Sequence, residues 1–276
     1  MSKKKPANES SSKTVTTLNQ NDPLYVTALA RGLSILKCCG EAAHDLSVSE
    51  IAKLLDLPQS TVWRACYTLE QHGYLVRVEN DRLRPGLAVI GLGYTALSRH
   101  SLAELAWPDM VVFSKEYQGA VSLGVPQGID MLYVARVESG PPLYPGLRVG
   151  SRVGVLGSAM GWAWLAALPK RKRNEFLAQA RAQTSEQYSR IYSQLADAIS
   201  FYDEHGFLVN SGVIHPELNA IGVAIGEESN QPAASISFGG ALAKFPVQRL
   251  LDEVAPRLLE IASGLSMSMR VGSPRT

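Results

Sequence analysis

Apolar residues recur at helical spacing in three consecutive segments between residues 23 and 73. The first segment begins near Pro23, and Gly40 is a suitable residue to end a helix. Its apolar stripe consists of Leu29, Leu33, Ile35, Leu36 and Cys39. We therefore expect a first helix that packs through this stripe.

The second and third segments carry start and stop signals. Ser47 is followed three residues later by Glu50, the capping-box pattern that begins a helix. The segment 56–58 ends this helix, and proline is tolerated in a first helical turn, so a third helix begins near Pro58 and closes at His72-Gly73. The residues expected to be buried are Ile51, Leu54 and Leu55 in the second helix and Val62, Ala65, Cys66 and Leu69 in the third.

A β-hairpin is expected after the three helices. Residues 74–78 and 82–84 are rich in β-forming residues, and they flank the turn-forming Glu79-Asn80-Asp81. Three helices followed by a hairpin constitute a winged helix-turn-helix, which we assign to residues 23–86. In such a domain the third helix presents its polar start to the major groove of DNA.

The remaining pattern predicts a linker helix and a second domain. Residues 87–105 are mostly apolar and helical in character, and we read 87–106 as a linker helix that also helps dimerisation. Strands are expected at 120–125, 131–137, 147–155, 207–211, 220–225 and 233–238. Helices are expected at 158–168, 174–181, 189–205 and 247–269, the last with Pro256 as a candidate kink. Strands and helices mixed without strict alternation predict an α+β domain over residues 107–270.

Length and composition bound the class of the protein. A chain of 276 residues, 46% hydrophobic and 19% charged, is long enough for two packed domains. No apolar run reaches the ~18 residues of a membrane span, and the polar start does not read as a secretory signal. The three cysteines lack zinc-site spacing and fit a reducing cytoplasm. Residues 1–22 are expected to be a disordered tail, and residues 271–276 a second tail.

The charge balance alone says little about a nucleic-acid partner. The net charge is +2, and residues 23–99 carry eight Lys or Arg against seven Asp or Glu. DNA-binding domains are usually more basic than this. The case for DNA therefore depends on where the charges lie.

The polar start of the third helix is the candidate DNA-reading surface, because burial of Val62 and Cys66 would turn it outward. The candidate DNA-binding residues on this helix are Gln59, Ser60, Thr61 and Arg64. Gln pairs with adenine, Arg pairs with guanine or a phosphate, and the free N–H groups of a first helical turn favour phosphates. Read without that context, these are the solvated residues of an ordinary helix start.

Further basic and aromatic residues flank this helix. Arg82 and Arg84 alternate along the second wing strand, so both side chains point to one face. That face could contact a phosphate or the minor groove, or it could be an ordinary solvated surface. Arg77 is a weaker candidate. Trp63 adjoins the buried stripe, and packing against the wing is favoured over contact with the DNA backbone.

Several sequence blocks, in this order and spacing, resemble the IclR-type bacterial transcriptional regulators from Tyr25 to Met269. The blocks are ARGLSIL (30–36), LPQSTVWR (57–64), LEQHGY (69–74), VGSR (149–152), GSAMG (157–161), HGF (205–207) and ASIS (234–237). The resemblance implies an N-terminal winged helix, a linker helix and a C-terminal effector-binding domain with a GAF-like sheet. It also implies homodimers, often paired into dimers of dimers on operator DNA, and small organic acids as effectors, frequently aromatic or central-metabolic carboxylates.

The resemblance also implies an effector pocket in the second domain. The candidate effector-binding residues are Ser158, Ala159, Met160, Gly161, Asn210, Leu218, Ala220, Ser235 and Ser237, of which Ser158 and Gly161 are added from the helix start itself. The first four begin a helix, whose free N–H groups and positive dipole end suit a carboxylate. Ser235 and Ser237 alternate on a strand and face the same side; without the resemblance they are merely a polar sheet face.

Some positions depart from the family pattern. Asn210 stands where relatives often have an acidic residue, Glu217 where they usually have glycine, and Ala224 where they frequently have proline. A pocket with few fixed charges besides the helix start favours a neutral-bodied acid, with an aromatic acid as one candidate. His215 reads as a surface loop histidine rather than as a pH-sensitive ligand contact.

Two other classes of function compete with this interpretation. We expect no enzymatic activity, no cofactor and no metal site, because GSAMG is not the Gly-x-Ser-x-Gly of a nucleophile elbow and the five histidines lack metal-ligand spacing. The alternative is a small-molecule-binding module without DNA-binding activity, against which the capping box, Pro58 and the polar start of the third helix all speak. The sequence thus predicts a ligand-responsive regulator of a catabolic or metabolic operon.

Overall fold

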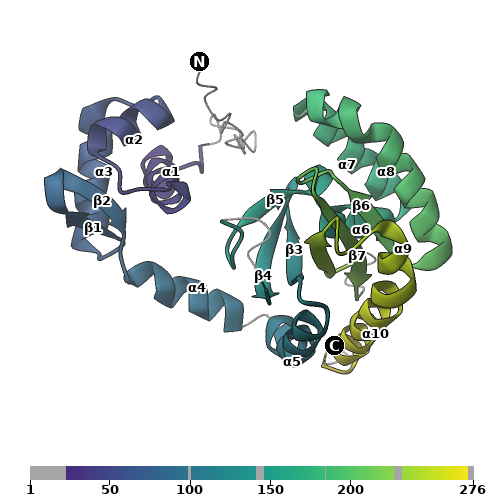
Figure 1. Cartoon of the computed structure of the whole chain (residues 1–276). Helices are drawn as coiled ribbons and strands as arrows, with labels where there is room; N and C mark the ends of the chain where they lie inside the picture. Colours follow the sequence, from purple (N-terminus) through teal and green to yellow (C-terminus); the bar gives the residue numbers. More distant parts are fainter. Residues whose placement is uncertain (1–22, 99–100, 141–145, 184, 227–231, 273–276) are drawn as a thin grey trace, which may run out of the picture. The chain divides into compact units, whose positions relative to one another are not determined.

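The computed structural model describes residues 23–98, 101–140, 146–183, 185–226 and 232–272. They form two compact units that divide between Ala96 and Leu97 (Figure 1). The predicted tail 1–22 lies outside the described residues, and of the tail 271–276 the first two residues end a helix. Within the described ranges, no helix combines the length and the apolar character needed to cross a membrane.

The first unit is a helix-turn-helix with a hairpin wing, as predicted. Its helices are α1 (Thr27–Glu41), α2 (Val48–Leu55) and α3 (Gln59–Gln71), and α4 (Ala88–Ser98) leads out of it. In the wing, β1 (Leu75–Val78) pairs antiparallel with β2 (Arg82–Pro85). Asn80 and Asp81 turn the chain between them with positive φ, which Asn and Asp tolerate better than other side chains do.

The capping box at the start of α2 is formed. The Ser47 hydroxyl accepts a hydrogen bond from the Glu50 N–H at 3.3 Å, and the Glu50 carboxylate accepts one from the Ser47 N–H at 2.8 Å. The hydrogen bonds from Ser47 lower the pKa of the Glu50 carboxyl. Asp56 ends the helix in the left-handed conformation, so the turn into α3 is tight.

The core of the first unit joins the three helices to the wing. Its fully buried members are Ile35, Cys39, Leu46, Val48, Ile51, Ala52, Val62, Cys66, Leu75 and Leu83. Three residues that the pattern placed in the core are exposed instead, namely Leu29 (63%), Leu33 (52%) and Leu54 (64%). The apolar stripes are wider than the faces that α1 and α2 bury, so periodicity alone assigned too many residues to the core. α1 also continues through Gly40, because one glycine costs a helix only ~1 kcal/mol.

The expected linker helix over 87–105 is divided in two. α4 ends at Ser98, α5 (Ser101–Tyr117) follows, and residues 99–100 lie outside the described residues. Leu102, Ala106, Met110 and Phe113 bury one side of α5 in the core of the second unit. α5 is therefore part of the packing of that unit.

The second unit is built on a six-stranded antiparallel sheet, which confirms the α+β class. The strand order is β5-β4-β3-β8-β7-β6. The strands are β3 (Ala120–Gln127), β4 (Asp130–Glu138), β5 (Arg152–Gly154), β6 (Leu208–Ser211), β7 (Leu218–Ile225) and β8 (Ala234–Ala241). Of the strand expected at 147–155, residues 152–154 form β5, and Gly150 and Ser151 add backbone hydrogen bonds to Tyr133 of β4.

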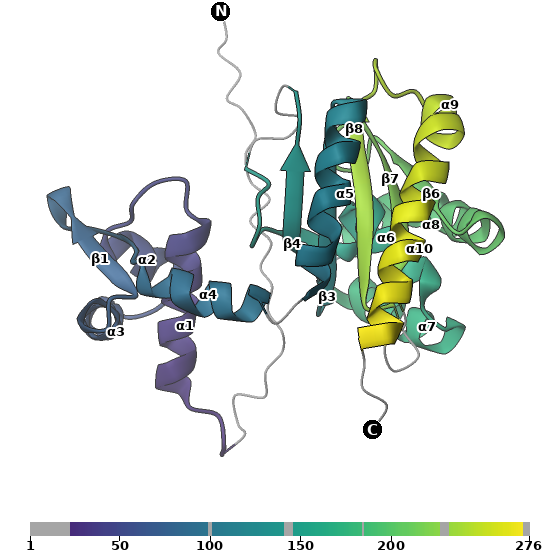
Figure 2. The same cartoon turned by 90° about the horizontal axis from the view of Figure 1, so that it is seen from below.

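Helices cover both faces of this sheet (Figure 2). α5 and α10 (Ala255–Gly272) pack on one face. α6 (Ala159–Ala167), α7 (Lys170–Gln183) and α8 (Ser185–His205) pack on the other. The expected helix over 247–269 is interrupted by a π-helical segment, Leu250–Val254, between α9 (Val247–Arg249) and α10. The break therefore precedes Pro256, which lies in the first turn of α10, where proline is tolerated.

Two glycines let α6 lie directly on the sheet. A Cβ on Gly222 of β7 would sit 2.3 Å from the Ala159 carbonyl oxygen, and a Cβ on Gly124 of β3 would sit 2.1 Å from the Met160 sulfur. Both distances are shorter than real contacts allow. The start of α6 is thus held against the middle of the sheet.

We expect Gly222→Ala to lower the free energy of unfolding by about 1–3 kcal/mol, the usual cost of overpacking a core. The clash is with backbone, which cannot rotate away. Urea denaturation of the full chain measures it as a lower midpoint. Gly239→Ala on β8 is the matched control, because a Cβ there has nothing within 4 Å. Equal midpoints for the two variants would contradict the close seating of α6.

Candidate DNA interface and ligand pocket

The start of α3 is polar and faces away from the core of the first unit. Val62 and Cys66 are fully buried and fix the rotation of the helix. Gln59, Ser60 and Arg64 are exposed on the other side, and Thr61 is half-buried. The structure thus brings the four predicted residues of this helix together at an accessible helix start.

Two aromatic rings extend the exposed surface of α3. Trp63 is 52% exposed and stacks on Tyr67, with ring centroids 5.8 Å apart and planes inclined by 14°. About half of the Trp63 side chain is therefore open to solvent, and its recorded ring contact is with Tyr67 of the same helix. Residues i and i+4 on a helix are neighbours, so the two rings form one flat apolar surface next to Arg64.

The three arginines of the wing differ in their partners. Arg77 forms ion pairs with Glu70 at 2.7 Å and with Asp81 at 2.8 Å, so it ties α3 to the wing turn. Arg82 donates to the Asp45 carbonyl and lies 3.2 Å from a Glu50 carboxylate oxygen. Arg84 is exposed. Of the two predicted wing residues, only Arg84 thus presents a guanidinium that is not already engaged within the described residues.

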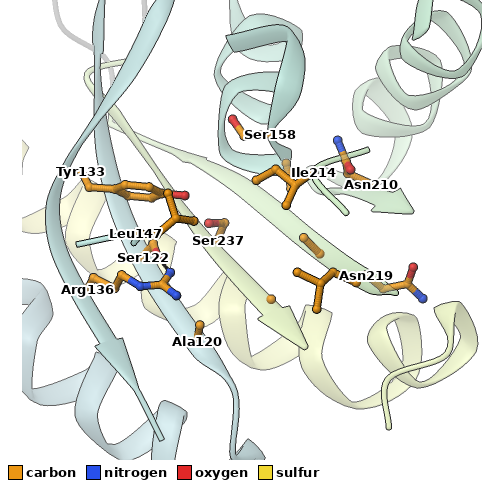
Figure 3. Close-up of a pocket in the computed structure, with 14 residues that line it drawn as sticks. Ala120, Ser122, Tyr133, Arg136, Leu147, Ser158, Asn210, Ile214, Asn219 and Ser237 are labelled. Atoms are coloured by element: carbon orange, nitrogen blue, oxygen red, sulfur yellow. Dashed lines mark hydrogen bonds between the residues drawn. The ribbon is translucent and has the colours of Figure 1, made fainter. Parts of the chain in front are cut away.

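The second unit contains a pocket between the sheet and the start of α6 (Figure 3). It is lined by Ala120, Ser122, Tyr133, Arg136, Leu147, Ser158, Ala159, Asn210, Ile214, Leu218, Asn219, Ala220, Ser237 and Gly239. In the close-up, Tyr133, Ser122 and Arg136 lie on one side, and Ser158, Ile214 and Asn210 lie on the other. Most of the lining is small or apolar, and Arg136 is its only charged residue among those described.

The floor of the pocket is made of small residues in register across the strands. Ser122 of β3 pairs with both Arg136 of β4 and Ser237 of β8. Two residues along β3 and on the same face, Ala120 pairs with Gly239 of β8, and Gly239 also pairs with Ala220 of β7. Short side chains in adjacent rows leave the free space that the helix start covers.

A β-bulge in β4 sets the direction of Arg136. Gly124 pairs with Tyr133 and Leu123 pairs with Ala135, so Val134 is an extra residue without a partner in β3. Such a bulge shifts the alternation of side chains by one residue. Tyr133 and Arg136, three positions apart, consequently both line the pocket.

Arg136 is held rigidly at the pocket wall. Its side chain is only 8% exposed, Nη1 donates to the Ser122 hydroxyl at 2.9 Å, and Nη2 lies 3.1 Å from a Glu138 carboxylate oxygen. The guanidinium carbon lies 6.0 Å from the centre of the Tyr133 ring. Burial raises the pKa of the Tyr133 hydroxyl, so this group stays protonated and can donate a hydrogen bond at neutral pH. Nε of Arg136 is buried and has no hydrogen-bond partner in the described structure.

The start of α6 is capped by its own side chain. The Ser158 hydroxyl accepts a hydrogen bond from the Gly161 N–H at 3.1 Å. Ser158 and Ala159 line the pocket, whereas Met160 and Gly161 do not and are buried against the sheet and Val155. The dipole of α6 still directs its positive end toward the pocket.

Of the remaining predicted pocket residues, some line the pocket and one does not. Asn210, Leu218, Ala220 and Ser237 line the pocket, and Ser235 does not. Ser235 lies in the row of Gly124, beneath α6, and its fully buried hydroxyl has no partner in the described structure. The two serines share a face, as alternation requires, but α6 covers only one of them completely.

Several lining residues were missed by the sequence interpretation. Arg136, Tyr133 and Ser122 lie on strands that were predicted, but alternation along β4 puts Tyr133 and Arg136 on opposite faces unless the bulge is known. Ile214 and Leu147 come from loops, for which the sequence offers no periodic signal. His215, read as a surface residue, is exposed and accepts a hydrogen bond from the Glu217 N–H at 3.3 Å.

Comparisons with known proteins find matches to both units of the chain. The profile described as the IclR helix-turn-helix domain matches residues 28–79, and that described as bacterial transcriptional regulator IclR C-terminal matches residues 94–267. The chain is 24% identical over 265 residues to the HTH-type transcriptional regulator TsaQ1/TsaQ2 of Comamonas testosteroni, with 95% of each chain covered. It is 28% identical over 248 residues to the Pca regulon regulatory protein of Pseudomonas putida, with 88% of this chain and 84% of that protein covered.

A solved structure gives the same result. The chain is 29% identical to an IclR family transcriptional regulator from Brucella abortus, with a TM-score of 0.76. The superposition covers 88% of this chain and 92% of the other. The likeness thus includes both units.

Proposed function

The chain belongs to the IclR family of bacterial transcriptional regulators, and from this premise we propose that it reads an operator in double-stranded DNA and responds to a small organic acid. Residues 23–86 bind the DNA, and the pocket beside α6 binds the acid. The regulated genes form a catabolic or metabolic operon. The proposal rests on one observation: the same chain has an exposed polar helix start at α3 and a pocket beside α6. The relatives are regulators rather than enzymes, so no reaction is assigned to the pocket.

The DNA contacts we propose combine base reading with phosphate binding. Gln59 and Arg64 reach base edges in the major groove, and the first turn of α3, with Ser60 and Thr61, binds a phosphate. Arg84 at the wing binds a neighbouring phosphate or enters the minor groove. Arg82 is the weakest member of the set, because Glu50 and the Asp45 carbonyl already engage it.

The salt dependence of operator binding tests these contacts. Arg64→Ala and Arg84→Ala should each reduce the slope of log affinity against log salt by about one unit if the lost contact is to a phosphate. Arg249→Ala, in the second unit, is the matched control and should leave the slope unchanged. An unchanged slope for Arg84→Ala would remove that residue from the interface. Arg82→Ala should mainly lower the stability of the first unit.

The exposed apolar residues of the first unit support a homodimer. They lie on the start of the unit and α1 (Leu24, Val26, Leu29, Leu33) and on α4 with its preceding residue (Leu87, Ile90, Leu92, Tyr94). Monomeric proteins rarely expose so many large apolar side chains on two helices. We propose that these residues are covered by a second copy, and that two dimers pair on the operator.

Sedimentation of the full chain tests the dimer. Ile90→Asp should shift the dimer toward monomer at micromolar concentration, because a charge would be buried in the apolar interface. Leu54→Asp places the same charge at an equally exposed leucine on α2 and should leave the dimer intact. Dissociation by both variants or by neither would contradict the proposed interface.

The pocket supports an acid with an apolar body. Its walls include Tyr133, Leu147, Ile214 and Leu218, and the positive end of the α6 dipole and the Arg136 guanidinium both favour an anion. An aromatic acid is one candidate, since an apolar ring suits these walls. For the acid to regulate DNA binding, it must bind the DNA-competent and incompetent arrangements with different affinity. We propose that α4 and α5 carry that difference.

Two measurements test regulation by an acid. Small carboxylates screened by thermal shift should include one that stabilises the protein by about 2.7 kcal/mol at a hundredfold excess over its dissociation constant. A mobility shift with the DNA upstream of the protein's own gene should then change when that acid is added. If no DNA is bound with or without the acid, the chain is the alternative, a small-molecule-binding module without DNA-binding activity.

A further inference from the structure

We infer that Arg136 binds the carboxylate of the ligand, and that the pocket selects a ring-bearing monocarboxylate with a neutral oxygen at its opposite end. The inference rests on the proposed function of the pocket and makes it more specific. It moves the carboxylate away from the start of α6, where the sequence interpretation placed it, to β4. Three features of the pocket lead to it, namely a free donor on Arg136, the charge of the lining and a free donor on Asn210.

The first feature is the unused hydrogen-bonding capacity of Arg136. The Arg136 side chain is more than nine-tenths buried, yet its Nε–H has no partner in the described structure. A buried donor without an acceptor costs free energy, and such a group in a pocket marks the position of a ligand atom. Nε and Nη2 point to the same side of the guanidinium, so one carboxylate can accept from both. Ser122 fixes the plane of the group through Nη1 at 2.9 Å.

The Glu138 carboxylate competes with a ligand carboxylate for the side of the Arg136 guanidinium that carries Nε and Nη2. Its carboxylate oxygen lies 3.1 Å from Nη2, while Nε is left free. A ligand carboxylate that binds Nε must share Nη2 with Glu138 or displace it. Glu138 therefore weakens ligand binding while it compensates the buried charge in the empty pocket.

The second feature is the charge of the lining. Arg136 is the single charged side chain among the described residues that line the pocket. The walls offer one cation for one carboxylate and no second cation for another. A second negative charge on the ligand would have no cation to pair with and only the partial positive charge of the α6 start nearby, so its desolvation would be compensated only in part. The pocket is therefore suited to a monoanion.

The third feature is a free donor at the far side. Nδ2 of Asn210, on β6, is buried and has no hydrogen-bond partner in the described structure. An amide N–H₂ donates to a neutral oxygen such as a hydroxyl or a carbonyl without demanding a charge. In Figure 3, Asn210 and Arg136 lie on opposite sides of the pocket. A ligand that satisfies both donors carries its carboxylate at one end and an oxygen at the other.

The apolar walls of the pocket favour a ring between the two donors. In the sheet, β4 and β6 are separated by β3, β8 and β7, so the two donors come from strands that are not neighbours. Tyr133, Leu147 and Leu218 provide apolar contact for the ring.

Calorimetric titration of the full chain with four related probes tests the ligand class. 4-Hydroxybenzoate should bind most tightly. 4-Hydroxybenzamide, which lacks the charge, should bind at least tenfold more weakly, and benzoate, which lacks the far oxygen, about 3- to 10-fold more weakly. Terephthalate, with a second carboxylate at the far end, should also bind more weakly than 4-hydroxybenzoate.

Substitutions of pocket residues test which end of the ligand each residue binds. Arg136→Gln should weaken 4-hydroxybenzoate binding about 10- to 100-fold, and Asn210→Ala should abolish the preference for 4-hydroxybenzoate over benzoate. Glu138→Gln should strengthen binding several-fold, because it removes the competing carboxylate. That gain cannot arise from damage to the fold, so it keeps the test informative even if Arg136→Gln is unstable. Arg152→Gln, on the adjacent strand β5 and outside the pocket lining, is the matched control and should bind like the unmodified protein.

The outcomes separate this inference from the proposed function. If 4-hydroxybenzoate binds Arg136→Gln and Glu138→Gln as it binds the unmodified chain, the acid-responsive regulator stands and the role of Arg136 is overturned. If none of the ring-bearing probes binds but another acid from the thermal-shift screen alters DNA binding, the ligand class is overturned and the proposed function again stands. If no acid binds at all, both fail.

Discussion

The close contact of α6 with the centre of the sheet is the constraint on which the second unit depends. Gly222 and Gly124 leave room for the Ala159 carbonyl and the Met160 side chain, and larger residues there would lift the helix away. With the helix so close, its capped start lies over rows of alanine, glycine and serine. The pocket is the space that these short side chains leave free. Helix seating, pocket shape and the direction of the helix dipole thus have one common cause.

Unsatisfied polar groups then indicate what the pocket holds. Three buried side-chain atoms lack a hydrogen-bond partner in the described structure, on Arg136, Asn210 and Ser235. The first two belong to residues that line the pocket, and Ser235 lies under α6. Native proteins leave few such groups, so two donors at opposite sides of one pocket are explained by a ligand that accepts from both. The first unit shows the opposite case, in which the polar groups of Ser47, Glu50 and Arg82 find their partners in one another.

Local signals predicted the arrangement of elements well. The capping box at Ser47, the turn at Asn80 and the alternation of Ser235 and Ser237 each correspond to the observed geometry. These local signals did not predict which side chains are buried or which face Arg136 points to, because tertiary packing determines both. Leu29 and Leu33 continue the apolar stripe of α1, yet the neighbouring helices cover only part of it. Arg136 was missed because the bulge at Val134 reverses the expected face of the strand, and a bulge has no distinct sequence signature here.

The central claim is that an acid in the second unit and DNA at the first unit influence each other's binding. Linkage requires that influence to be reciprocal, with the same factor in both directions. The most direct measurement is therefore the dissociation constant of the acid for the full chain, determined with and without saturating operator DNA. The account predicts that the two constants differ by the same factor, about 5- to 150-fold for typical coupling, by which the acid changes operator affinity. Identical constants in the two titrations would contradict it.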